Sequence, residues 1–312
     1  MIQQKKPIHI LLPLLFVPFS SILAAVLRTV ALFTNYDGTR DYFTRASVIH
    51  QVFLILLPLL MVAFFAFAVF LRHEQTPTVV SGGLMTLFAV VFLLVTLFVG
   101  AIYGFLALRK MDAVSGAMRT FTILASLMAL ISLPHYVLFL FDRYLGSNLR
   151  GILGLAPALC SLFAAMLLYF DTTTQMNQPA KLLSLFAFLL VSCHALFECR
   201  LLLGKPVGFL YFFVTASAMV ACASASLPNL LYCLLERREL VLSTTLDFFL
   251  FAMFFYLLAR LLQLLPRPAR GTPRLLRILM NRRVEEEAAE GEEEMAAEEE
   301  APVAEEKGEE NA

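Results

Sequence analysis

The sequence predicts an all-α membrane protein, a polytopic bundle of about eight transmembrane helices. Of its 312 residues, 60% are hydrophobic and 15% are charged, against roughly 25% charged residues in an ordinary soluble domain. The mean hydropathy is +0.79. Eight apolar runs are long enough to cross the hydrocarbon core of a bilayer, which takes about 20 helical residues. Together these observations exclude a soluble domain.

The eight runs are uniformly apolar rather than alternating, which excludes barrel strands and favours helices. The first run follows Lys5 and Lys6 and lacks the small residues of a cleavage site, so we expect an uncleaved anchor. In order along the chain, the predicted spans cover residues 8–33, 49–71, 82–107, 120–141, 151–170, 182–203, 208–235 and 244–265.

Charge divides the chain into a transmembrane domain, residues 1–265, and two polar segments, 266–284 and 285–312. After Val284 there are 14 of the 24 acidic residues and one base, Lys307, so that segment carries −13 and the preceding part +13. Its low apolar content predicts that the glutamate-rich tail 285–312 is disordered. This tail either serves solubility and repulsion, or competes with lipid for the arginine segment, or docks on a basic protein partner.

The segment 266–284 is rich in arginine, which predicts a cytoplasmic position and contact with anionic lipid headgroups. With eight spans the N-terminus is then cytoplasmic as well, and the protein lies in the cell membrane. Arg109, Lys110 and Arg119 would fall in an outside loop, which counts against this orientation. The residues expected at the membrane surface are Arg267, Arg270, Arg274, Arg277, Arg282 and Arg283.

Small residues one turn apart in "TASAMVACASAS" predict that the seventh helix packs closely with its neighbours at the bundle centre. Pro228 and Asn229 predict a kink in this helix. The Asn229 side chain would either bond to the backbone carbonyls freed at the kink or form part of a ligand-coordinating break.

The stretch "SCHALFECR" places His194, Glu198 and Arg200 within an apolar run. His194 and Glu198 are four residues apart, so they share a helix face, whereas Arg200 can extend to the interface. A carboxylate near the hydrocarbon edge is costly unless it is paired or faces the bundle interior. The cluster therefore indicates either a His–Glu or Arg–Glu structural clasp or a proton-linked or cation-coordinating site.

His135, after Pro134, is the candidate partner for this site, because it falls in the same half of the membrane. The candidate polar site thus contains His135, His194, Glu198 and Asn229. Two histidines and one glutamate are a weak metal signal, so we predict neither a metal nor a cofactor.

The other intramembrane charges are expected at helix ends, where long side chains extend into the interface. They are Arg28 and His50 at the outer ends of the first two helices, and Asp247 and Arg260 at the two ends of the eighth. A pair between Arg28 and Asp247 is an open alternative.

All five cysteines fall within apolar runs, which predicts small packing residues and no disulfide framework. The chain contains no H-E-x-x-H, G-x-S-x-G or phosphate-loop pattern, and we assign no catalytic residue.

At "LRTVALFTNYDGTRDYFTRAS" and "LFECRLLLGKPVGFLYFFVTASA" the sequence resembles uncharacterised multi-pass membrane proteins of anaerobic Gram-positive bacteria. An arginine, a leucine-rich helical turn and a loop containing Asp and Gly carry the resemblance. It implies a cell-membrane location and no particular activity.

Three function classes remain open. The first is a non-enzymatic membrane protein that acts through partners, the second is a secondary transporter or channel for a small solute or cation at His194 and Glu198, and the third is an intramembrane enzyme. Packing of the fourth, sixth and seventh helices around a water-accessible cavity would favour transport, whereas a solid core would favour a scaffold. The sequence does not indicate an oligomeric state.

Overall fold

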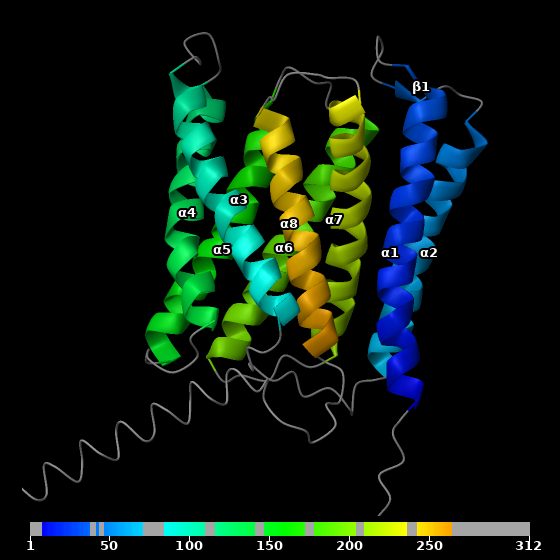
Figure 1. Ribbon diagram of the computed structural model, residues 1–312, viewed down its shortest axis with the longest axis horizontal. Coiled ribbons are helices and arrows are strands. Elements are labelled where there is room, and N and C mark those ends of the chain that lie inside the picture. The colour runs from blue at the N-terminus through cyan, green and yellow to red at the C-terminus, as the bar shows by residue number, and fades with distance from the viewer. Residues whose placement is uncertain are drawn as a thin grey trace, which may run out of the picture. The chain divides into compact units, whose positions relative to one another are not determined.

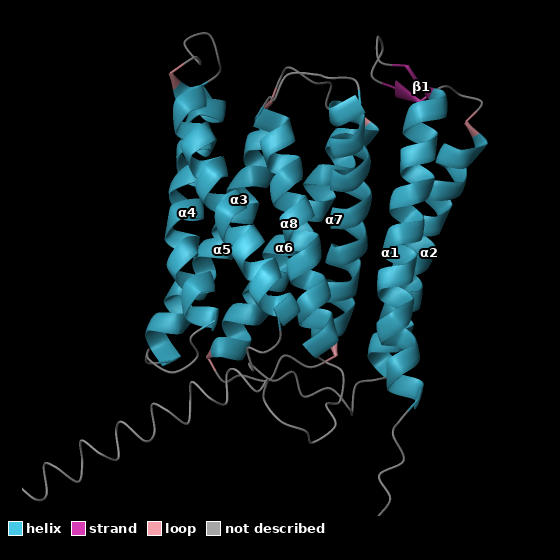
Figure 2. Ribbon diagram, viewed as in Figure 1, coloured by secondary structure: helices cyan, strands magenta, loops and turns pink. Residues whose placement is uncertain are grey.

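The computed structural model describes residues 8–37, 42–43, 47–70, 84–109, 116–140, 147–171, 178–203, 209–235 and 242–263. Within these ranges, all eight predicted spans are confirmed as helices long and apolar enough to cross a membrane (Figure 2). The arginine segment and the acidic tail lie outside the described residues. The helices are α1 (Ile8–Asn35), α2 (Val48–Phe70), α3 (Leu84–Leu108), α4 (Gly116–Leu140), α5 (Ser147–Phe170), α6 (Pro179–Leu202), α7 (Leu210–Leu235) and α8 (Leu242–Gln263).

A short antiparallel hairpin follows α1, formed by β1 (Tyr36–Asp37) and β2 (Tyr42–Phe43). Tyr36 pairs with Phe43, and the two rings pack with their centroids 5.4 Å apart. The Tyr36 hydroxyl accepts a hydrogen bond of 3.0 Å from Gln178 Nε2 at the start of α6. These contacts connect the hairpin to the ends of the helices.

Successive helices run in opposite directions, so α1 begins and α8 ends at the same end of the bundle (Figure 1). We call this the terminal end, and we call the opposite end, where β1 and β2 lie, the hairpin end. By the same alternation, α3 and α7 begin at the terminal end, and α4 and α6 finish there.

Six of the helices close a ring. Each helix from α3 to α8 packs against the next, and α8 packs against α3. Outside this ring, α1 packs on α7, and α2 packs on both α1 and α7. The ring therefore encloses an interior, and the side chains and open space inside it are where a functional site is expected.

The seventh helix is the most buried, as its small residues predicted. In its most apolar window 78% of the residues are buried, against 22% in α2. Ser217, Ala221 and Ala225 are each fully buried. Small side chains let the α7 backbone approach α6, α8 and α1 closely, because bulkier groups would hold those helices apart.

Two other contacts depend on small residues. A Cβ atom added at Gly104 of α3 would lie 2.2 Å from Ser126 Oγ of α4. Between α5 and α6, the Cys199 thiol donates to the Gly151 carbonyl at 3.0 Å, and a Cβ at Gly154 would lie 3.3 Å from the Cys199 Cα. The backbones of these helix pairs are thus close together within the apolar layer.

Candidate functional site

The interior of the ring near the terminal end is occupied by a buried ion pair between Glu198 of α6 and Arg260 of α8. Arg260 Nε donates to Glu198 Oε1 at 2.8 Å, and Arg260 Nη2 donates to Glu198 Oε2 at 2.9 Å. Glu198 is 4% exposed and Arg260 is 2% exposed. The contact is bidentate, which is the strongest arrangement of an arginine and a carboxylate.

Further groups complete the environment of both charges. The Tyr211 hydroxyl of α7 donates to Glu198 Oε1. Arg260 Nη1 donates to Gln263 Oε1, and Gln263 Nε2 donates in turn to Thr86 Oγ1 of α3 at 3.0 Å. The guanidinium also lies over the Phe139 ring of α4, with its Cζ atom 4.9 Å from the ring centroid. Five of the six ring helices thus meet around one ion pair.

His194 lies one helical turn from Glu198 and is 1% exposed. Its Nδ1 atom is 3.0 Å from Thr215 Oγ1. The Thr215 hydroxyl proton is already donated to the Tyr211 carbonyl at 2.6 Å, so we assign the ring proton of His194 to Nδ1. Nε2 is then an acceptor without a hydrogen-bond partner, 3.5 Å from Glu198 Oε1.

Aromatic rings connect His135 to this group. Tyr256 packs against His194 at 6.2 Å between centroids and against Tyr136 at 5.3 Å. Tyr136 in turn packs against His135 at 5.0 Å. The Tyr256 hydroxyl is buried without a hydrogen-bond partner. We refer to Glu198, Arg260, Tyr211, His194 and Tyr256 as the polar cluster.

Toward the hairpin end, the interior of the ring contains a small cavity of about 60 Å³. Two of its hydroxyls are already bonded to their own helices, Thr96 to the Phe92 carbonyl and Thr122 to the Met118 carbonyl, each at 2.8 Å. None of its described lining residues carries a charge. The cavity is lined by Thr96, Leu97, Gly100, Ala101 and Gly104 of α3, Thr122, Ala125, Ser126 and Ala129 of α4, Cys160, Ala164 and Leu167 of α5, and Thr245, Leu246 and Phe249 of α8.

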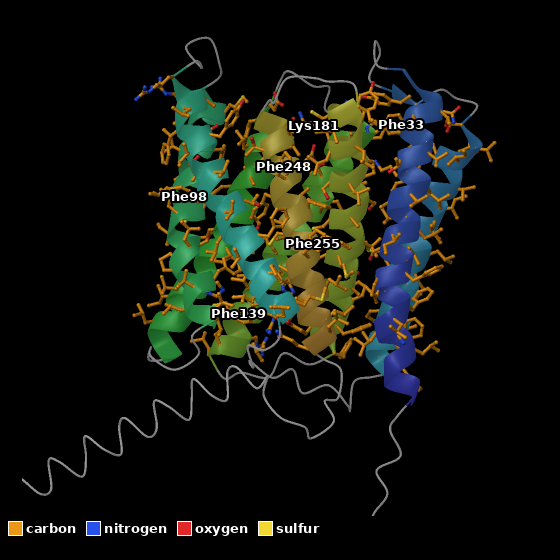
Figure 3. All side chains as sticks on the ribbon, in the orientation of Figure 1. Phe33, Phe98, Phe139, Lys181, Phe248 and Phe255 are labelled. Atoms are coloured by element: carbon orange, nitrogen blue, oxygen red, sulfur yellow. The ribbon has the colours of Figure 1, made fainter. Side chains whose placement is uncertain are left out.

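The cavity and the polar cluster occupy successive levels of the ring. Thr245, on the cavity wall, and Arg260 are separated by about 22 Å along α8 at 1.5 Å per residue. In Figure 3, Phe139 marks the terminal end beside the polar cluster, and Lys181 lies at the hairpin end. The open space thus lies toward one end of the ring and the polar cluster lies at the other.

The structure places two of the four sequence-predicted site residues, His194 and Glu198, side by side, whereas the rings of Tyr136 and Tyr256 lie between His135 and His194. It separates Asn229, which lies toward the hairpin end and donates from Nδ2 to both carboxylate oxygens of Asp247 at 3.3 Å. The Asn229 amide therefore binds the Asp247 carboxylate rather than backbone carbonyls near Pro228. Glu198 is paired with an arginine, as one alternative expected, and that arginine is Arg260.

The expectation that Arg260 and Arg28 reach the interface is wrong for both. Each is 2% exposed, because neighbouring helices cover it. Arg200, by contrast, is exposed as predicted. Sequence analysis also missed Tyr211, whose position at the start of an apolar run is equally typical of a tyrosine that anchors a helix at the interface.

The cavity does not lie between the fourth, sixth and seventh helices, the position that the sequence analysis named as favouring transport. The cavity lies among α3, α4, α5 and α8, and neither His194 nor Glu198 lines it. Among the described residues, no group of three His, Cys, Asp or Glu side chains could hold a metal ion. The five cysteines are free.

Comparison with known proteins does not supply a function. No family model, curated protein or solved structure matches the chain.

Proposed function

We propose that the ring of α3–α8 transports a small uncharged solute across the membrane, and that the Glu198–Arg260 pair is a latch closing its terminal end. One observation carries the proposal: a single ring interior holds a cavity toward one end and a sealed ion pair at the other. Alternating access requires a central site that is closed toward one side of the membrane at a time, and a cavity beyond a closed ion pair fits such a state.

The depth of the cavity supports this proposal. Thr96 and Ala129, at its inner limit, lie near the midpoints of α3 and α4. Substrate sites of secondary transporters lie near the bilayer midplane. Because the lining carries no charge, the cavity suits an uncharged solute better than a cation. A cation site at Glu198 has less support, since Arg260 already neutralises that carboxylate.

The latch can open because a buried ion pair contributes little net stability. Its attraction is offset by the cost of removing both charges from water, so exchanging the pair for two hydrated groups costs little free energy. α6 and α8 are not sequential neighbours in the ring, and they share far less direct packing than either shares with α7. Separating their terminal ends would break the Glu198–Arg260 contact while leaving the larger helix interfaces in place.

The alternatives have less support. An intramembrane enzyme would need a reactive group next to a space for substrate, whereas both Glu198 oxygens are engaged and the polar cluster does not line the cavity. A scaffold that acts through partners does not need the interior space. The protein belongs in the cell membrane, and the arginine segment 266–284 favours the cytoplasmic side for the terminal end.

Accessibility of the cavity to a thiol reagent from each side of the membrane tests the proposal. Cys160 lines the cavity, so it serves as the reporter after the other four cysteines are replaced by alanine. A second reporter, Gly100→Cys in a cysteine-free chain, fits because an added Cβ would lie at an ordinary 3.5 Å from Thr245. Vesicles of known orientation are treated with a membrane-impermeant methanethiosulfonate, and the labelling rate is measured.

In the wild-type background we expect both reporters to react faster from the side of the hairpin end. Glu198→Gln should raise labelling from the terminal side at least tenfold, because it removes the counter-ion that holds Arg260 across the ring. Arg200→Gln, an exposed arginine near the same end, is the matched control and should change neither rate. If neither reporter reacts from the terminal side in the Glu198→Gln variant, the core is closed and the scaffold class becomes the better reading.

A further inference from the structure

A second arginine, Arg28 of α1, lies buried near the hairpin end, and two of its guanidinium nitrogens have no hydrogen-bond partner among the described residues. It is 2% exposed, yet its Nε and Nη2 atoms have no hydrogen-bond partner. Its one described ring contact is with Phe53 of α2, whose centroid lies 6.0 Å from Cζ. Measured along α1, Arg28 is about 10 Å from the end of the helix at Asn35. Unpaired N–H groups at such a depth are costly, because no bulk water satisfies them.

The two unpaired atoms are those that Arg260 uses to bind a carboxylate. In Arg260, Nε and Nη2 form one edge of the guanidinium and hold both oxygens of Glu198 at 2.8 and 2.9 Å. Arg28 presents the same edge, buried to the same degree, without a hydrogen-bond partner among the described residues. The planar fork of an arginine matches two oxygens of a carboxylate or a phosphate, and Arg28 therefore has the geometry for such a ligand.

The polar groups around Arg28 do not fill this edge. Asp247 of α8 is close enough to interact electrostatically with Arg28, as is the Tyr36 hydroxyl. However, the Asp247 carboxylate accepts from Asn229 Nδ2 through both oxygens, and it makes no ion pair of 4.0 Å or less with the described atoms of Arg28. Asp247 thus faces α7, and its charge is partly satisfied there.

His50 of α2 provides a second unpaired atom at the same end. Its ring stacks on Phe43 of the hairpin, with centroids 3.9 Å apart, and its Nδ1 atom is buried without a hydrogen-bond partner. Arg28 is close enough to act electrostatically on this ring. A guanidinium edge and an imidazole nitrogen, from two packed helices, are thus both without partners at the hairpin end.

We infer that Arg28 is the anchor of an oxyanion-binding site at the hairpin end, with the Nε–Nη2 edge holding two oxygens of a carboxylate or phosphate group. His50 contributes a second donor when its proton is on Nδ1. The site lies between α1 and α2, which pack on the outside of the six-helix ring, so it is separate from the cavity and from the polar cluster. The ligand is either a free anion or the phosphate of a membrane lipid, because the two present the same oxygens.

The test measures thermal unfolding of the full-length protein in a non-ionic detergent. One titration adds inorganic phosphate at constant ionic strength, maintained with chloride, and another adds short-chain phosphatidylglycerol against short-chain phosphatidylcholine. A ligand that binds only the folded state raises the unfolding temperature in a saturable manner. Arg28→Lys keeps the positive charge and removes the fork, while Arg200→Gln removes an exposed arginine as the matched control.

We expect saturable stabilisation of the wild type and of Arg200→Gln, and at least a tenfold loss of apparent affinity in Arg28→Lys. Stabilisation by inorganic phosphate identifies a free anion as ligand, whereas stabilisation by phosphatidylglycerol alone identifies a lipid headgroup. The inference is overturned if neither titration stabilises the wild type, or if Arg28→Lys responds as the wild type does. Strong destabilisation by Asp247→Asn together with no anion response would show that Asp247, not a ligand, is the partner of Arg28.

Discussion

Glu198 and Arg260 face each other from two helices that are not sequential neighbours in the ring, joined by two hydrogen bonds of 2.8 and 2.9 Å. Both side chains are almost completely buried, and Tyr211, Gln263 and Phe139 occupy their remaining surfaces. This pair connects α6 to α8 at the terminal end, below a cavity that extends toward the hairpin end. The contribution of this pair to stability and the separation of α6 and α8 can be measured in separate experiments.

Removal of one charge of the pair should lower the free energy of unfolding strongly, because the remaining charge stays buried without its counter-ion. Glu198→Gln leaves a buried guanidinium without its counter-ion, and Arg260→Gln leaves a buried carboxylate with the Tyr211 hydroxyl as donor but without its counter-ion. Breaking a buried pair from one side costs about 3–5 kcal/mol. We expect each single variant to lower the free energy of unfolding in mild detergent, and the double variant to lower it by clearly less than the sum.

The coupling energy in this cycle should fall within about 0.5–3 kcal/mol, as for residues in contact. Arg200→Gln is the control, since an exposed substitution at the same end of α6 should change stability by no more than about 0.5 kcal/mol. Additive effects of Glu198→Gln and Arg260→Gln would show that the two side chains do not interact in the folded protein.

Two tyrosines of the polar cluster should respond differently to the loss of a hydroxyl. Tyr211→Phe removes the donor to Glu198 Oε1 and should cost about 1.5–3 kcal/mol, the range for hydrogen bonds to charged groups. Tyr256→Phe removes a buried hydroxyl that has no partner, so it should leave stability unchanged or raise it. Chemical unfolding of both variants checks this difference, and equal destabilisation would mean that the Tyr256 hydroxyl has a partner in solution.

Two glycines of α3, Gly104 facing α4 and Gly100 facing α8, should respond differently to replacement by alanine. Gly104→Ala places a Cβ atom 2.2 Å from Ser126 Oγ, so the helices must separate or Ser126 must change rotamer. Overpacking of this kind costs about 1–3 kcal/mol. Gly100→Ala meets only an ordinary 3.5 Å contact with Thr245 and should be nearly neutral. The unfolding midpoints of the two variants should therefore differ, and the prediction fails if Gly104→Ala is as stable as Gly100→Ala.

The sequence predicts the helices well and the polar contacts only in part. Hydrophobic run length identifies a span directly, because the bilayer thickness fixes the number of residues needed. The i and i+4 spacing also places His194 beside Glu198. Pairing between helices depends instead on which faces meet, and one sequence carries no such information. Arg260 therefore looked the same as an arginine that reaches the interface, and Asn229 looked like a partner of Glu198.

The central claim is that the Glu198–Arg260 pair opens and closes rather than holding α6 and α8 at a fixed distance. Pulsed electron spin resonance tests this directly with spin labels at Arg200→Cys on α6 and Leu262→Cys on α8, after the native cysteines are replaced. Arg200 is exposed and Leu262 is half-buried, so both positions are suitable for labels. Asp247→Asn, a carboxylate-to-amide change at the opposite end, is the control for Glu198→Gln.

With the spin labels at positions 200 and 262 and the protein in lipid nanodiscs, we predict two distance populations. Glu198→Gln should shift most molecules to the longer distance, and Asp247→Asn should leave the wild-type distribution unchanged. A single distance, identical in wild type and Glu198→Gln, would contradict the account and identify the pair as a fixed clasp in a solid bundle.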